Sequence, residues 1–242
     1  MAGVAWETAN QIIQDAAYEL GLITADVADV FASTDQNIIQ LRQMLTRIGR
    51  DLVKAKQWSH LQKEGTITTS DSDADYDLPN DFDRLIANTY WNRTDDVPGV
   101  PVDGQVWQYF KAQSLTAAVT ALFRIQDNEV QIIPTPSATE SIAFEYISSY
   151  WVKESGQSAG NTTRADASTD TILFDPTLVM HALKLAFKRA KGLDSTAEQA
   201  DYLSRLSAVA GGDGASPVLS LVPSGGVRLL DELNLPDTGW GS

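Results

Sequence analysis

Cysteine is absent from the 242-residue sequence, and histidine is nearly so. Without cysteine the chain has no disulfide, no thiol nucleophile and no thiolate metal site, which is consistent with a reducing compartment. His60 and His181 have no partner at the spacing of metal ligands, so we interpret both as structural. Nucleophile-elbow, Walker A, dinucleotide-binding and HExxH motifs are also missing. We therefore predict no catalytic residue, no metal site and no cofactor.

Basic residues are scarce. The 18 Lys and Arg stand against 32 Asp and Glu, a formal charge of −14, which argues against a protein whose main task is to bind nucleic-acid phosphates. Residues 66–174 alone hold 6 basic and 16 acidic side chains, a net of −10. One middle segment therefore carries most of the acidity of the chain.

Long apolar runs are missing as well. The longest apolar stretches are interrupted by charge, and the first residues lack the basic start and apolar core of a signal peptide, so we expect synthesis in a cytoplasm and no membrane partner. A hydrophobic content of 43% is nevertheless enough to bury a substantial core.

Helical periodicity occupies the first part of the chain. Residues 8–20 place apolar side chains on one face before Gly21, which is suited to stop a helix. Ser33 or Thr34 is expected to cap a longer helix. The apolar positions of that helix recur at spacings of three and four: Ile38, Leu41, Leu45, Ile48, Leu52 and Ala55. We favour a core face for this stripe over a seam between subunits.

Strand and turn signals replace this period after Gly65. Short strands are predicted at 66–69, 76–79 and 85–91, a hairpin at 121–134, a half-buried strand at 141–151, and one helical piece at 106–113. Residues 153–170 are rich in Ser, Gly, Thr, Asn and Asp and predict a long exposed loop. The middle of the chain is thus expected to form a small, mainly antiparallel sheet.

Helical signals return at Asp175, which is placed as an N-cap before Pro176. This helix is expected to have a wide apolar face from Leu178 to Ala190, to carry basic residues in its last turn and to end at Gly192. Ser195 and Glu198 predict a capping box at the start of a final helix. Its apolar positions are Ala200, Leu203, Leu206 and Val209, and the two helices are expected to form a hairpin.

The segment 211–242 mixes Gly, Pro and Ser with short apolar clusters that are too small to form a core. We interpret it as an extended arm that becomes ordered on a partner surface, with terminal disorder as the alternative. The residues expected to contact the partner are Val218, Leu219, Leu221, Val222, Leu229, Leu230 and Trp240.

Three features of the middle segment bear on a rival function. Asp71, Asp73, Asp75 and Asp77 resemble a calcium loop only superficially, because Tyr76 and Phe82 occupy the positions that need Gly and Glu. Two carboxylates converging on a cleft would suit a hydrolase, and sequence alone does not exclude such a pair. The aromatic side chains are expected to fill the core, with a sugar-binding or subunit-binding surface as the alternative: Tyr90, Trp91, Trp107, Tyr109, Phe110, Tyr146, Tyr150 and Trp151.

The order of these signals over residues 35–210 resembles the head-to-tail adaptor family of short-tailed bacteriophages, the group of tail tubular protein A and related head-completion proteins. The resemblance is carried by a helix ending in Trp-Ser-His-Leu at 58–61 and by Tyr-Asp-Leu-Pro-Asn-Asp-Phe-Asp-Arg-Leu at 76–85. Further matches are Phe-Arg-Ile and Ile-Ile-Pro within 123–134, Phe-Glu-Tyr-Ile and Tyr-Trp-Val within 144–152, the run at 186–194, and Tyr202.

This resemblance implies a virion structural protein and brings no catalytic residue with it. About twelve copies would form a ring that docks on the portal protein, continues the DNA channel and receives the tail nozzle and tail fibre proteins. Genomic DNA would pass without specific binding, and the C-terminal arm would reach between portal subunits. The rival prediction is a phage-associated glycan (peptidoglycan) hydrolase or a sugar-binding module.

We therefore expect an α+β protein. A helical bundle would be formed by residues 1–65 and 175–210, a β-rich, mainly antiparallel insertion by residues 66–174, and an extended C-terminal arm by residues 211–242.

Overall fold

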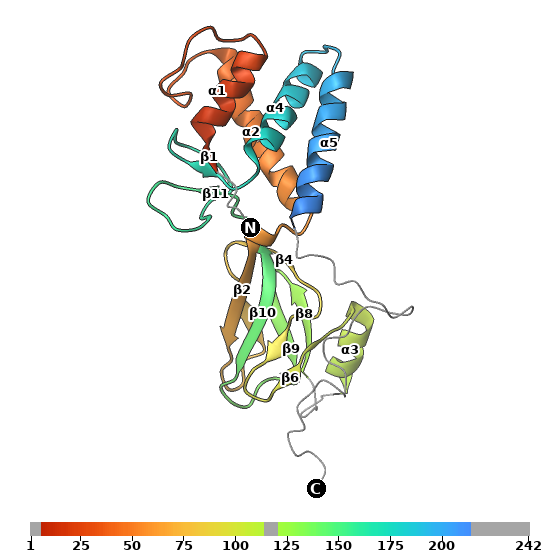
Figure 1. Cartoon of the computed structure of the whole chain (residues 1–242). Coiled ribbons are helices and arrows are strands. Elements are labelled where there is room, and N and C mark those ends of the chain that lie inside the picture. Colours follow the sequence, from red (N-terminus) through yellow and green to blue (C-terminus); the bar gives the residue numbers. More distant parts are fainter. Residues whose placement is uncertain (1–5, 114–120, 214–242) are drawn as a thin grey trace.

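The computed structural model describes residues 6–113 and 121–213 (Figure 1). Helices from the two ends of this range pack together, and the chain between them forms antiparallel sheets, so the predicted α+β class is confirmed. One hydrophobic core lies among the helices and a second among the central strands. We call residues 6–61 and 149–213 the helical part and residues 62–148 the β part.

Helix α1 (Ala9–Glu19) begins at Thr8 and ends just before Gly21, as predicted. The Thr8 side chain accepts a hydrogen bond from the N–H of Gln11, whose own side chain accepts one from the Thr8 N–H. Gly21 has a φ of 66°, a left-handed conformation that glycine adopts without steric cost. The predicted apolar face is buried at Ile12, Ile13, Ala16 and Ala17.

Helix α2 (Gln36–Ala55) buries the predicted stripe except at its last position, Ala55, which is exposed. The predicted cap at Ser33 or Thr34 is wrong. Asp35 is the N-cap, because its carboxylate accepts hydrogen bonds from the N–H groups of Asn37 and Ile38. Since Leu41, Leu45 and Leu52 are each at most 1% exposed, the stripe is a core face, as favoured from the sequence.

Helices α4 (Pro176–Ala190) and α5 (Thr196–Gly212) form the predicted hairpin (Figure 1). The predicted capping box is wrong, because Ser195 makes no side-chain cap and Glu198 instead forms an ion pair with Lys188. Helix α5 covers α4 from outside and has no fully buried residue. Leu203, expected on its inner face, is 52% exposed.

A three-stranded sheet in the helical part was not predicted. It joins β1 (Glu7–Thr8), β12 (Thr171–Ile172) and β11 (Val152–Lys153) in antiparallel order. Trp151 and Phe174, at the two ends of the segment 151–174, lie in the core of the helices. From the sequence, this segment was expected to belong to the β-rich insertion. The predicted loop at 153–170 is largely exposed, but Ala165 and Asp170 within it are buried.

Two sheets make up the β part. The first contains β2 (Gln62–Thr68), β10 (Ser141–Ser148), β5 (Trp91–Asn92) and β6 (Val97–Pro98), with β4 (Phe82–Leu85) also paired to β10. The second contains β3 (Asp75–Asp77), β9 (Glu129–Ile133), β8 (Leu122–Gln126) and β7 (Val100–Pro101). Among the strands that the structure describes, only β7 and β8 pair in parallel, so the sheets are mainly antiparallel, as predicted.

Two smaller predictions in the β part are confirmed. Helix α3 (Gly104–Ala112) covers the predicted helical piece and begins at Asp103, whose carboxylate accepts from the N–H of Val106. The hairpin of β8 and β9 turns at Asp127 and Asn128, whose positive φ values of 54° and 66° suit a two-residue turn.

Strand β10 differs from its prediction as a half-buried strand over 141–151. It ends at Ser148, and six of its eight residues are buried. The alternation fails because Phe144 and Tyr146 face the core of the β part while Ile147 belongs to the core of the helical part. Strand β10 therefore carries the chain from one core to the other.

Polar contacts fix the place where the two parts meet. The Asp81 carboxylate accepts hydrogen bonds from Lys63 (2.6 Å), Tyr146 (2.8 Å) and Ser148 (2.6 Å). Burial by itself would raise the pKa of Asp81, but these hydrogen bonds outweigh it and hold the pKa below its usual range. Arg84 donates to the carbonyls of residues 53 and 56, which α2 leaves unpaired at its end.

Candidate functional site

The histidines lie on the helical part, at separate positions. His60 packs against the rings of Trp6, Trp58 and Phe174. Burial lowers its pKa below the usual range, although Asp213 and the Leu173 carbonyl act in the opposite direction. His181 lies on α4, and its Nδ1 is buried without a hydrogen-bond partner.

No metal-binding arrangement of three or more His, Asp or Glu side chains occurs within residues 6–113 and 121–213. Asp71 and Asp73 lie in the turn before β3, and Asp75 and Asp77 lie on that strand. All four side chains are exposed, and Asp73 accepts a hydrogen bond from the N–H of Asp75, as in a polar turn. In the same described residues, no helix is long and apolar enough to cross a membrane.

One pair of carboxylates on the β part meets the first requirement of the rival hydrolase. Glu64 and Glu145 are direct neighbours across β2 and β10, beside Trp91, in a depression of about 250 Å³. Arg93 occupies both oxygens of Glu64, at 3.0 and 2.9 Å, and the Glu64 side chain is 52% exposed. A general acid of a glycosidase is kept protonated by burial of its carboxyl group, and neither Glu64 nor Glu145 is buried.

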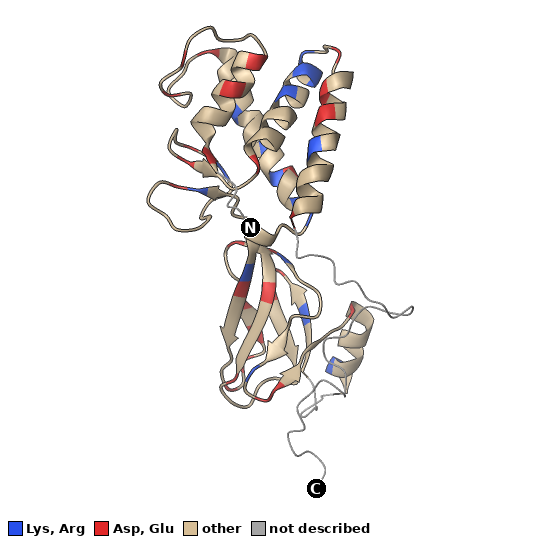
Figure 2. Ribbon diagram, in the orientation of Figure 1, with Lys and Arg blue, Asp and Glu red and all other residues tan. Residues whose placement is uncertain are grey.

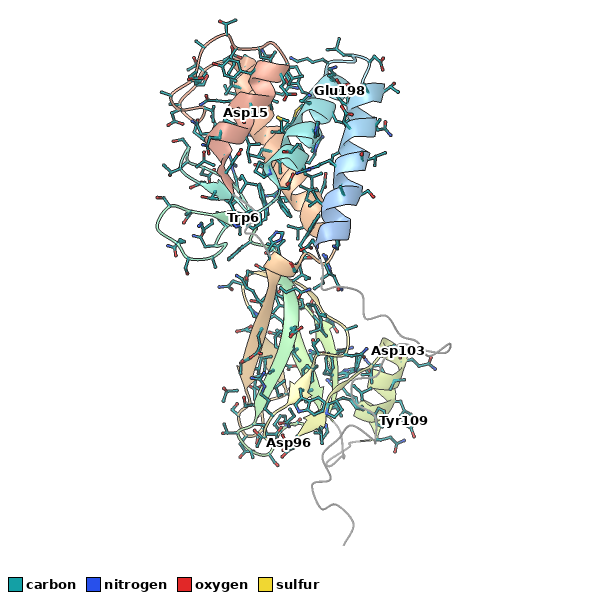
Figure 3. All side chains as sticks on the ribbon, in the orientation of Figure 1. Trp6, Asp15, Asp96, Asp103, Tyr109 and Glu198 are labelled. Atoms are coloured by element: carbon teal, nitrogen blue, oxygen red, sulfur yellow. The ribbon has the colours of Figure 1, made fainter. Side chains whose placement is uncertain are left out.

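The aromatic side chains of the middle segment are divided between the core and the surface. Tyr90, Trp107, Tyr146 and Trp151 are at most 4% exposed, which confirms the core interpretation for these four. The largest exposure, 59%, belongs to Tyr109 on α3, which points outward in Figure 3. Trp91, Phe110 and Tyr150 are partly exposed.

The predicted arm residues from Val218 to Trp240 lie outside the described residues. The segment expected to begin at Gly211 is still helical there, since α5 continues through Gly212. Asp213, the C-cap, is fixed to the segment between α2 and β2. Its carboxylate accepts hydrogen bonds from the N–H and Oγ of Ser59 and forms an ion pair with Lys56, which also donates to the Asp213 carbonyl. The root of the C-terminal segment is therefore held at the junction of the two parts.

A pocket of about 260 Å³ adjoins this root. Its walls come from residues that are distant in sequence, namely Trp6, Trp58, His60, Phe174, Asp175, Leu178, Val209, Gly212 and Asp213. Most of the exposed lining is apolar. Both carboxylates of the lining are in ion pairs, Asp175 with Arg205 and Asp213 with Lys56. The pocket is thus suited to contact apolar groups.

A second depression, of about 610 Å³, lies between α2, α4 and α5. Ile48 and Leu185 form an apolar floor and are 7% and 6% exposed. Arg47 and Arg189 stand on its two sides, together with Asp51 and Tyr202. We call this surface the arginine groove, defined by Arg47, Ile48, Asp51, Ala182, Leu185, Ala186, Arg189, Ala190 and Tyr202.

The outer side of α1 is acidic. Asp15 and Glu19 are exposed, and Asp15 projects outward from α1 in Figure 3. Tyr18, 39% exposed, donates a hydrogen bond of 2.8 Å to Asp26 in the following loop. We call Asp15, Tyr18 and Asp26 the acidic flank.

Sequence reasoning did not find these surfaces. The groove combines residues of α2 and α4 that are more than a hundred positions apart, and only the packed helices bring them together. The contact of Asp213 with Lys56 and Ser59 is equally distant in sequence. A partial signal did exist for the acidic flank, because no Lys or Arg precedes Arg42.

Comparison with known proteins identifies one family. A family model described as SU10 adaptor protein matches residues 8–220, which include both cores and all the described helices and strands after β1 begins. A search among curated proteins finds no significant match.

Proposed function

The chain belongs to the SU10 adaptor protein family, and from this premise we propose that it joins the portal to the tail of a short-tailed bacteriophage. The family match carries this proposal. The family consists of structural adaptors of phage particles and is not a class of enzyme, so the chain is a component of the virion. The resemblance predicted from the sequence is confirmed at this level.

The proposed assembly is a ring of about twelve copies that docks on the portal protein and receives the tail nozzle and tail fibre proteins. In such a ring the residues after Asp213 form the portal-binding arm. This is supported by the clamp of Asp213 to Lys56 and Ser59, which gives the arm a fixed origin, and by its apolar residues. A chain of 29 residues, 214–242, spans at most roughly 100 Å when fully extended, ample to reach a neighbouring subunit.

Genomic DNA passes through the proposed ring without specific binding. Support comes from the excess of carboxylates in residues 66–174, which would repel phosphates wherever they face the channel. In Figure 2, Asp and Glu are distributed over the strands and turns of the β part, with Lys and Arg between them. An assembled ring with Lys and Arg on its channel wall would contradict this part of the proposal.

The roles of the helical part and the β part are also proposals. We assign the helical part to contacts within the ring and the β part to the channel and tail, with the segment 149–174 grouped with the helices because Trp151 and Phe174 lie in their core.

The proposal is tested by mixing the purified chain with the portal of the same phage and measuring masses by mass photometry, with negative-stain microscopy of the products. We expect a monomer in the free chain and a ring on the portal. Absence of portal binding at several salt concentrations would contradict the proposal. Hydrolysis of peptidoglycan by the chain, abolished by Glu145→Gln, would instead establish the rival function.

A further inference from the structure

The arginine groove and the acidic flank lie on different sides of the helical part. In Figure 1, α1 and α5 stand on the two sides of α4, and the groove opens between α4, α5 and α2. Helix α1 contacts α2 and α4, whereas α5 contacts α4. One copy therefore presents the two surfaces in different directions.

The arginine groove has positive charges available for a partner. Within residues 6–113 and 121–213, Arg47 and Arg189 take part in no ion pair. Arg189 donates one hydrogen bond of 2.8 Å to the neutral side chain of Gln199. Asp51 offsets one of the two charges, so the groove keeps a net positive charge above an apolar floor.

The acidic flank has the opposite character. The first 41 residues contain six Asp and Glu and no Lys or Arg. Asp15 and Asp26 form no ion pair in the described chain, although Glu19 beside them pairs with Lys184. The hydrogen bond from Tyr18 to Asp26 holds an aromatic ring at the surface between the two carboxylates, and tyrosine is enriched in the centres of protein interfaces.

We infer that the acidic flank of one copy docks in the arginine groove of the next copy around the ring. This inference rests on the proposed function, because a closed ring needs two different, complementary surfaces on each subunit. Tyr18 supplies the apolar group for the floor formed by Ile48 and Leu185, while Asp15 and Asp26 meet Arg47 and Arg189. Charge complementarity selects a second copy as the occupant, since the chain itself carries both surfaces.

The contact is weak between free copies. Exposed ion pairs contribute little individually and are screened by salt, so two free chains associate only at high concentration and low ionic strength. Binding to the portal raises the local concentration of neighbouring copies and thereby closes the ring. This order prevents rings from forming before the portal is present.

Charge reversal tests the inference. Arg47→Glu with Arg189→Glu, and Asp15→Arg with Asp26→Lys, should each reduce the fraction of portals that carry a complete ring at least tenfold in negative-stain images. A chain that combines all four changes restores complementarity with reversed sign and should form rings again. Lys111→Glu with Asp77→Lys on the β part is the matched control and should assemble like the unmodified chain. Circular dichroism and thermal melting check that every variant is folded.

A second measurement does not require the portal. Sedimentation velocity of the free chain at low salt and high concentration should show self-association that either double reversal removes and the fourfold variant recovers. Rings unaffected by both reversals, or a fourfold variant that does not recover, would overturn the inference. Loss of portal binding by the unmodified chain, with this self-association intact, would contradict the proposed function and leave the contact between copies standing.

Discussion

At the scale of single residues, Gly49 shows how closely α2 approaches the strands. A Cβ atom at this position would lie 2.2–2.4 Å from ring atoms of Trp151, which is itself fully buried. We expect Gly49→Ala to lower the free energy of unfolding by about 1 to 3 kcal/mol, because the indole has no space into which it can move. Urea denaturation followed by circular dichroism measures this change.

Gly211 in α5 is the matched control for that prediction. A Cβ atom there would have no heavy atom within 4 Å, and its backbone is helical. Gly211→Ala should therefore leave stability unchanged or raise it by up to about 1 kcal/mol, since alanine favours helix. A destabilisation equal to that of Gly49→Ala would mean that the loss at position 49 does not come from Trp151.

Residue signals were most reliable where the interaction is local. Gly21 and Gly192 were predicted to end helices and both have positive φ, and Asp175 was predicted as an N-cap and accepts from the N–H of Leu178. The capping box at Ser195 failed because Lys188, on the preceding helix, binds the Glu198 carboxylate. Whether Lys188 or the helix N-terminus binds Glu198 depends on the packing of α4 against α5. The spacing of residues along one helix does not predict that packing.

At the scale of elements, the Asp213 carboxylate helps to hold the end of α5. Burial would raise the pKa of Asp213, but hydrogen bonds from Ser59 and the charges of Lys56 and His60 outweigh it, so the pKa lies below its usual range. A depressed pKa stabilises the fold fully above the unfolded-state value near pH 4, and this contribution disappears as pH falls through the folded-state pKa.

Asp213→Asn should therefore lower the free energy of unfolding by about 1 to 2 kcal/mol at neutral pH and reduce the acid dependence of stability. Hydrogen exchange at the end of α5 should become faster, because the helix loses the ion pair of its C-cap with Lys56 and weakens the hydrogen bonds with Ser59. Asp201→Asn, an exposed position on the same helix, is the control and should change neither quantity. Equal acid dependence in both variants would contradict the stabilising role of Asp213.

Long elements could be predicted from the sequence, and very short strands could not. Helices α2 and α4 have an apolar period of several turns, and the hairpin of β8 and β9 has a turn of two suitable residues. Strands β11 and β12 have two residues each, and β12 pairs with both β11 and β1, the strand at the other end of the chain. Their sequence has no periodicity that would distinguish them from loop.

At the scale of the whole molecule, every core residue that the structure describes precedes residue 214. A chain that ends at Asp213 should thus melt within about 2 °C of the full-length chain, since no described core residue is lost. It should fail to join the portal, because the proposed arm is missing. Gly211–Asp213 are retained in this variant since they belong to the end of α5.

Thermal melting and mass photometry with the portal measure the two effects separately. Normal docking by the truncated chain would contradict the role of the arm. A chain that ends at residue 227 keeps Val218–Val222 and removes Leu229, Leu230 and Trp240, and its docking would show which apolar cluster contributes.

The class of the protein and its family could be recognised from the order of local signals, whereas its interaction surfaces could not. The helical core joins α1 and α2 to α4, which are separated by the whole β part. This long-range packing determines which charges face outward and which residues of α2 and α4 lie next to each other. The acidic flank and the arginine groove therefore became visible only in the folded chain.

The β part is connected to the helices by two backbone crossings, at residues 56–62 and 148–151, and both lead into the paired strands β2 and β10. A force that pulls the two parts apart is thus shared by two covalent chains. The seven residue pairs between β2 and β10 lie side by side and are not links in the path of that force. Separating the parts by force would have to break the hydrogen bonds from Arg84 to the carbonyls of residues 53 and 56, which cross the junction. The junction therefore opposes separation of the two parts with two lengths of covalent chain as well as with side-chain contacts.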